Sequence, residues 1–198
     1  MDSPQSADSA VAKSALRDQV QAARKRRPLD AAARFAADVR DVAMAWPPVR
    51  DAATVTAYVS VGSEPGTGLL LDALVAAGKR VLLPVVVAGL DLDWVVYTGR
   101  SGLVPAVRGL LEPVGPRLGK EAIAQADVVL VPGTAVSSDG ARLGQGGGCY
   151  DRALPRVTPG TPVAVVLYDD EVGLAVPRDP HDVRVGFALT SSGVAPLQ

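Results

Sequence analysis

Apolar residues in the first quarter of the chain recur every three to four positions, the spacing of one face of an α-helix. The pattern predicts a helix from Lys13 to Arg27 and a second from about Asp30 to Trp46, each followed by proline. The stripe of the first helix consists of Ala12, Leu16, Val20 and Ala23. Residues 1–12 are polar and acidic, and we expect them to form a disordered tail before a single domain at residues 13–198.

After residue 46 the pattern changes to short, continuous apolar runs separated by helical or turn-rich segments. Continuous runs are typical of strands that are covered on both faces. Strands are expected at 54–59, 80–87, 92–97, 127–131, 161–168 and 184–190, and helical segments at 66–77, 121–126 and 149–157. Residues 99–120, rich in glycine and proline, are expected to be irregular. This alternation predicts an α/β protein with three α/β/α layers, a mostly parallel Rossmann-like sheet and two N-terminal helices.

A glycine-rich loop follows the expected strand at 127–131. Four of the five residues from Gly144 to Gly148 are glycine, and a helix is expected to begin at Cys149. Glycine lets backbone N–H groups approach an anion, and the start of a helix adds positive potential. The loop has neither the Gly-Lys-Ser/Thr of a Walker A motif nor the third glycine of a dinucleotide fingerprint. It predicts a nucleotide-phosphate site, and a flexible loop with a helix cap is the alternative.

Charged residues around this loop have two interpretations each. Lys13, Arg17 and Arg24 lie within about 40° of one another on the first helix. Lys13 and Arg17 could reach a triphosphate, although a solvated basic face is the commoner explanation. Residues 24–27 are interpreted as solvated charge. Asp151 and Asp182 could bind Mg²⁺ together with substrate phosphates, or they could be a helix-terminus charge and a turn residue.

Glu64 follows the expected strand at 54–59, where the carboxyl ends of parallel strands usually form a site. It could accept hydrogen bonds from a ligand with adjacent N–H groups, or it could simply be solvated. His181 is the single histidine and cannot by itself build a zinc site. Cys149 has no suggested histidine partner, and nothing indicates covalent catalysis.

The composition of the chain argues against several classes of function. The 198 residues are 48% apolar, which is enough for a sizeable core, and the net charge of −1 predicts no general affinity for nucleic acid. A single cysteine allows no internal disulfide, and no apolar run is long enough to span a membrane. We expect a cytoplasmic protein that has no nucleic-acid or membrane partner and is a monomer.

Several motifs, in the correct order over about residues 13–193, resemble those of the 5-formyltetrahydrofolate cyclo-ligase family, also called methenyltetrahydrofolate synthetase. The longest match begins at Pro132-Gly133 and Asp139-Gly140 and continues from Arg142 to Asp151, where the family has Arg-Leu-Gly-x-Gly-x-Gly-Tyr-Tyr-Asp. Shorter similarities are Lys13 to Arg17, Tyr58 to Glu64, Gly78 to Pro84, Glu112-Pro113 and His181-Asp182.

The resemblance implies an enzyme that uses ATP as co-substrate and Mg²⁺ as cofactor to convert 5-formyltetrahydrofolate to 5,10-methenyltetrahydrofolate, with release of ADP and phosphate. It places Mg²⁺ at Asp151 and Asp182 and assigns the catalytic charges to Lys13, Arg17 and Arg142. It places ATP against Lys13, Ser14, Ala15, Leu16, Arg17, Arg142, Leu143, Gly144, Gln145, Gly146, Gly147, Gly148, Cys149 and Tyr150. It places folate against Val59, Glu64, Gln145, Gly146, Gly147, Gly148 and Cys149.

Two positions depart from the family pattern. Cys149 stands where the family usually has the first tyrosine of Tyr-Tyr-Asp, and Ser191 follows Thr190 where the family usually has glutamate. Neither change removes a phosphate or metal ligand. These departures support the alternative that the protein is a divergent paralogue, which binds ATP and acts on another small substrate. A non-catalytic nucleotide-binding module is the alternative from a different class.

Overall fold

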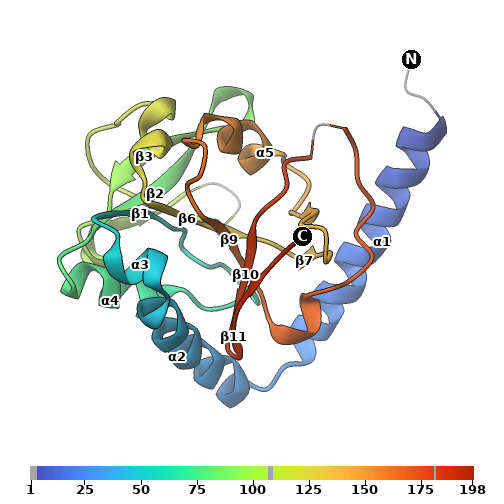
Figure 1. The fold of residues 1–198 in the computed structure, drawn as a ribbon, viewed down its shortest axis with the longest axis horizontal. Helices are drawn as coiled ribbons and strands as arrows, with labels where there is room; N and C mark the ends of the chain where they lie inside the picture. The colour runs from blue at the N-terminus through green and yellow to red at the C-terminus, as the bar shows by residue number, and fades with distance from the viewer. Residues whose placement is uncertain (1–3, 107–108, 181) are drawn as a thin grey trace.

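The computed structural model describes residues 4–106, 109–180 and 182–198 (Figure 1). The α-helices are α1 (Pro4–Arg26), α2 (Leu29–Ala45), α3 (Pro47–Asp51), α4 (Gly68–Ala76) and α5 (Cys149–Ala153). The 3-10 helices are η1 (Ala88–Leu90), η2 (Arg100–Gly102), η4 (Lys120–Gln125), η5 (Leu154–Arg156) and η6 (Asp169–Glu171). The strands are β1 (Thr54–Thr56), β2 (Arg80–Val87), β3 (Asp91–Val96), β4 (Leu103–Pro105), β5 (Leu111–Pro113), β6 (Val128–Pro132), β7 (Ala135–Val136), β8 (Arg142–Leu143), β9 (Val163–Val166), β10 (Phe187–Thr190) and β11 (Gly193–Pro196).

The main sheet has seven strands in the order β11-β10-β9-β6-β1-β2-β3. Its inner neighbours, from β10 through β9, β6 and β1 to β2, are all parallel. The two edge strands, β11 and β3, are antiparallel to the strands beside them. The prediction of a mostly parallel α/β sheet is therefore confirmed.

The central strand β6 shows why its sequence is a continuous apolar run. Val128 and Leu130 pack into one core with residues of α2 and α4, such as Phe35 and Leu74. Val129 and Val131 pack into a second core on the opposite face, with residues of η4 and α5. Both faces of the sheet are covered, which gives the expected three layers (Figure 1).

Helix α1 begins at Pro4, nine residues before the predicted start at Lys13. Residues 4–12, expected to be a disordered tail, are therefore helical in the structure, and residues 1–3 lie outside the described part of the chain. The helix runs beside the C-terminal segment of the chain (Figure 1), where Arg24 contacts Glu171 and Lys13 contacts Asp182. It thus lies along the loops that follow the parallel strands.

Several elements are shorter in the structure than predicted, and others were not predicted. The helix expected at 149–157 ends at Ala153 and continues as a 3-10 turn, because Pro155 has no N–H to donate to the helix. Strand β1 ends at Thr56, although the N–H of Ala57 still donates to the carbonyl of Leu82. Strand β11 was missed because four residues are too few to show a period. The segment expected to be irregular contains the short antiparallel pair β4–β5.

Among the described residues, no helix combines the length and apolar character that a membrane crossing requires.

Candidate functional site

A cavity of about 1220 Å³ lies at the carboxyl ends of the parallel strands. Its walls come from the ends of β2 and β6, the loops that follow β1 and β9, the glycine-rich loop, and one side of α1. Pockets for a single drug-sized ligand have volumes of about 300–1,000 Å³. This cavity can therefore hold more than one such ligand.

The glycine-rich loop crosses the cavity between β8 and α5 and lines it from Gly144 to Gly148. Gly146 and Gly148 have φ angles of +95° and +66°, a region that disfavours side chains. A Cβ at Gly144 would lie only 2.8 Å from Nη1 of Arg142, so glycine lets the loop pass over the guanidinium. The helix after the loop has five residues, so its dipole is weaker than the sequence predicted.

The predicted basic face of α1 reaches the cavity, but only in part. Lys13 and Arg17 both line it, and Arg17 Nε donates a hydrogen bond of 2.7 Å to the carbonyl of Gly144. Helix and loop are thus brought together as the sequence analysis expected. Ser14 and Ala15 are exposed and Leu16 is half-buried, and none of these three is a lining residue of the described cavity.

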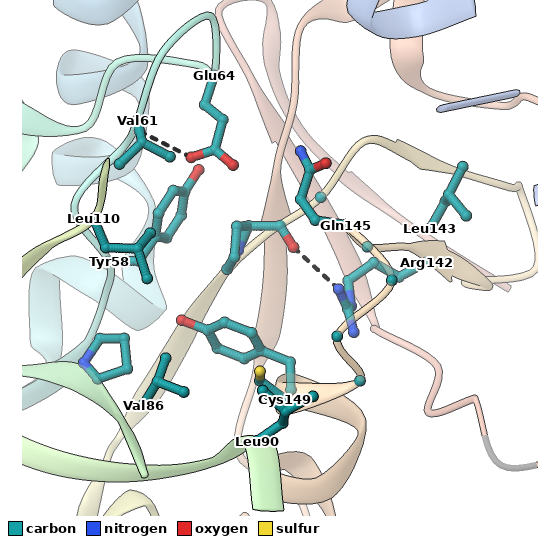
Figure 2. Close-up of a pocket in the computed structure, with 18 of the residues that line it drawn as sticks. Tyr58, Val61, Glu64, Val86, Leu90, Leu110, Arg142, Leu143, Gln145 and Cys149 are labelled. Carbon is teal, nitrogen blue, oxygen red and sulfur yellow. Dashed lines mark hydrogen bonds between the residues drawn. The ribbon is translucent and has the colours of Figure 1, made fainter. Parts of the chain in front are cut away.

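Arg142 is buried beneath the glycine-rich loop, with 6% of its surface exposed. Its Nη2 donates to Oδ1 of Asp151 over 3.0 Å. Its Nη1 donates to the carbonyl of Pro132 over 3.3 Å, the bond drawn at Arg142 in Figure 2. Its Nε has no hydrogen-bond partner within the described ranges. The side chain is thus held between the end of β6 and α5.

Three carboxylates line the same part of the cavity: Asp151, Asp182 and Asp179. The ammonium of Lys13 lies 2.7 Å from Oδ2 of Asp179 and 2.5 Å from Oδ2 of Asp182. Burial lowers the pKa of Lys13, but the hydrogen bonds to the two aspartates outweigh this effect, so the pKa is raised. The positive charge of Lys13 is therefore held at the cavity wall.

The carboxylates suit a hard cation that also takes ligands from a substrate. Within the described ranges, no group of three or more histidine, cysteine, aspartate or glutamate side chains could hold a metal alone. Mg²⁺ commonly binds through one or two carboxylates plus substrate phosphates. Asp179 was not predicted, and its place in the long loop after β9 gave no sequence signal. The neighbouring His181 lies outside the described residues.

Glu64 extends from the loop after β1 into the cavity, opposite Gln145 of the glycine-rich loop (Figure 2). One carboxylate oxygen accepts the N–H of Val61 over 3.0 Å. Burial raises the pKa of Glu64, and this effect exceeds the opposing effects of the Val61 N–H, Arg24 and Gln145. The ionised form is thus destabilised in the ligand-free protein, and a ligand that donates hydrogen bonds to it would relieve that cost.

The wall near Glu64 is largely apolar. Val59 and Cys149, both predicted to contact substrate, line the cavity and are half-buried. Cys149 lies near Leu90 and Val86 in Figure 2. Apart from Ser14, Ala15 and Leu16, every predicted site residue therefore lies at this one cavity.

Arg24 is a cavity residue that the sequence analysis wrongly treated as solvated charge. Only 3% of it is exposed, and its Nε and Nη2 donate to the two carboxylate oxygens of Glu171 over 2.6 and 2.7 Å. Its Nη2 also donates to the carbonyl of Gly133 over 2.8 Å. The spacing of Lys13, Arg17 and Arg24 on one helix face was the signal that could have identified it.

A family model described as the 5-formyltetrahydrofolate cyclo-ligase family matches residues 9–191. A protein of Mycolicibacterium smegmatis with that enzyme name is 50% identical over 143 residues, which are 69% of this chain and 73% of the relative. An Escherichia coli K12 protein of the same name is 39% identical over 114 residues, 56% of this chain and 62% of the relative.

Two solved structures resemble the whole fold. The 5,10-methenyltetrahydrofolate synthetase of Aquifex aeolicus superposes with a TM-score of 0.79 at 29% identity, covering 94% of this chain and 93% of the other. A 5,10-methenyltetrahydrofolate synthetase of Mycoplasma pneumoniae gives a TM-score of 0.71 at 21% identity, covering 90% and 98%, and supports the fold. Sequence and fold agree with the motifs at the cavity, and this enzyme belongs to the 5-formyltetrahydrofolate cyclo-ligase family.

Proposed function

We propose that this protein closes 5-formyltetrahydrofolate to 5,10-methenyltetrahydrofolate with ATP and Mg²⁺, releasing ADP and phosphate. One observation carries the proposal beyond family membership. The basic side chains of Lys13 and Arg17 line the same cavity of about 1220 Å³ as Glu64, whose carboxylate lies among largely apolar walls. Two ligands bound there, one with phosphates and one with a ring, would be side by side.

The basic part of the cavity suits phosphoryl transfer. The formyl oxygen of the folate attacks the γ-phosphorus, the bond to the β-phosphate oxygen breaks, and ADP leaves. This transfer requires charge compensation and positioning rather than a protein nucleophile. Lys13, Arg17 and Arg142 supply positive charge at the wall of the cavity. Mg²⁺ bound by Asp151 and Asp182 would add positive charge beside the phosphates.

The second part of the reaction is ring closure. The phosphorylated formyl carbon is electrophilic, and N10 of the folate attacks it. The C–O bond then breaks, and phosphate leaves with the former formyl oxygen and the N10 proton. We propose that Glu64 orients the folate by accepting hydrogen bonds from N–H groups of its pterin ring, so that N10 approaches the activated carbon.

The direct test is the absorbance of the methenyl product with 5-formyltetrahydrofolate, ATP and Mg²⁺ present together. We expect the product to form only when all three are present, with one ADP per methenyl group. A protein that makes ADP only with another small substrate would be the divergent paralogue. A protein that binds ATP but makes no ADP with any formylated compound would be a nucleotide-binding module. Either result would overturn the proposal.

Asp151→Asn and Asp182→Asn are expected to raise the Mg²⁺ concentration required for half-maximal turnover, because each variant loses a carboxylate beside the phosphates. Affinity for 5-formyltetrahydrofolate without ATP should stay near the wild-type value. A Mg²⁺ titration of turnover and a direct folate-binding measurement check both parts. Asp41→Asn is the matched control, because Asp41 is an exposed aspartate that pairs with Arg40 away from the cavity. Titrations of Asp151→Asn and Asp182→Asn that overlay the wild type would show that neither carboxylate acts through the metal.

A further inference from the structure

The hydroxyl of Tyr58 is a buried polar group that the proposed function does not yet use. Tyr58 is 4% exposed and its ring packs in the core on the α2 side of the sheet. Its Oη has no hydrogen-bond partner among the residues that the structure describes. The residue nevertheless lines the large cavity.

The position of the Tyr58 backbone is fixed by its neighbours. Thr67 Oγ1 donates to the carbonyl of Tyr58 over 2.7 Å and accepts the N–H of Ser60 over 3.0 Å. These bonds join the start of the loop after β1 to the residue just before α4. The backbone that carries the ring is therefore held in place before any ligand arrives.

The hydroxyl of Tyr58 points toward the carboxylate end of Glu64 (Figure 2). Burial raises the pKa of Tyr58 well above its usual value, and the negative charge of Glu64 adds to this effect, so the phenol stays protonated. A protonated phenol can donate a hydrogen bond, whereas the carboxylate of Glu64 can only accept. The two groups together present one donor beside two acceptors.

A buried hydroxyl without a partner destabilises a protein, and phenylalanine would fill the same space without that cost. The hydroxyl therefore has no role in the ligand-free fold that the structure shows. A bound ring that carries a hydrogen-bond acceptor next to N–H donors would satisfy both Tyr58 and Glu64. The pyrimidine edge of a pterin has this arrangement, with a carbonyl oxygen next to a ring N–H and an amino group.

We propose that Tyr58 is a specificity-determining residue of the folate site, whose hydroxyl donates to the ring carbonyl of the pterin while Glu64 accepts from its N–H groups. This inference rests on the proposed function, because it assigns the substrate of the same cavity. Tyr58 holds the ring and takes no part in phosphoryl transfer.

The test compares Tyr58→Phe with the wild type in binding, turnover and stability. We expect the Kd and KM for 5-formyltetrahydrofolate to rise about tenfold, which corresponds to about 1.4 kcal/mol. The KM for ATP and kcat at saturating folate should change less than twofold. The melting temperature of the ligand-free variant should equal or exceed that of the wild type, because the change removes only an unpartnered hydroxyl.

A ring fragment and a matched tyrosine sharpen the comparison. Binding of 5-formyltetrahydropterin, which lacks the aminobenzoylglutamate tail, should weaken by the same factor in Tyr58→Phe. Tyr168→Phe should bind folate as the wild type does, because Tyr168 packs against Phe35 and under Arg27 and is not a lining residue of the described cavity.

Each other outcome has a distinct meaning. Unchanged folate affinity in Tyr58→Phe, with an active wild type, would overturn the role of Tyr58 and leave the proposed function intact. A clear fall in the melting temperature of the ligand-free variant would show that the hydroxyl has a partner within the fold, and would also overturn the role. A wild type that neither binds nor converts 5-formyltetrahydrofolate would overturn both proposals.

Discussion

Replacing Arg142 with alanine is expected to lower kcat for methenyl formation by on the order of 10²-fold or more. Arg142 lies directly beneath the glycine-rich loop, with a side chain only 3% exposed. A fixed guanidinium at this depth stabilises charge on a transferring phosphoryl group more than a solvated one does, because little water screens it. Steady-state kinetics at saturating ATP, Mg²⁺ and folate measure this effect.

Arg142→Ala is also expected to lower the free energy of unfolding, whereas replacing an arginine on the surface would change it little. Asp151 would lose its partner at 3.0 Å and the carbonyl of Pro132 would lose a donor. We expect a fall of about 1–3 kcal/mol in the free energy of unfolding, so kinetics must be measured well below the melting temperature. Arg142→Lys is the control: it keeps the charge but not the forked geometry, and should lie between the wild type and alanine in kcat. Wild-type kcat in Arg142→Ala would show that this arginine is purely structural.

Arg24→Met is expected to lower the free energy of unfolding by about 3–5 kcal/mol. The reason is the partner left behind: the carboxylate of Glu171, 3% exposed at its side chain, would be buried without a cation. The carbonyl of Gly133 would also lose its donor. Since small domains are stable by only about 5–15 kcal/mol, urea unfolding should show a large shift of the midpoint.

A double-mutant cycle separates the ion pair from other effects of the substitution. Glu171→Gln keeps an acceptor for the N–H of Tyr168, which Glu171 accepts at 3.1 Å, and removes the charge. Combining it with Arg24→Met should cost clearly less than the sum of the two single variants, because no unpaired charge then stays buried. Arg40→Met, which breaks an exposed pair with Asp41, should change stability by less than about 0.5 kcal/mol. An equally small change in Arg24→Met would contradict the assignment of Arg24 as a buried anchor.

The sheet and the glycine-rich loop could be predicted because their signals are local. Continuous apolar runs such as 80–87 and 127–131 must be covered on both faces, and this alone indicates parallel strands between two layers. The five-residue run from Gly144 to Gly148 stands out because few other sequences permit such backbone angles. Lys13 and Arg17 could be placed near this loop only through the resemblance to the family.

The partners of the charged residues could not be predicted, because they depend on contacts between distant segments. Arg24 is four residues before Pro28 in a run of basic residues, a pattern typical of solvated charge. Only the fold brings Glu171 into contact with it. Asp179 lies in a long loop without periodicity, and only the fold places it beside Lys13. The Tyr58 hydroxyl was missed for a related reason: its lack of a partner is a property of the packed interior, not of the sequence.

The contacts of α1 also determine when the site can form during synthesis. Lys13 and Asp182 are 169 positions apart, and Arg24 and Glu171 are 147 apart. Closing loops of this length is entropically costly. Helix α1 is synthesised long before Glu171 and Asp182, which follow β9 in the chain. Lys13 and Arg24 therefore lack these two carboxylate partners until the segment after β9 has been synthesised, and this side of the cavity cannot be completed before then.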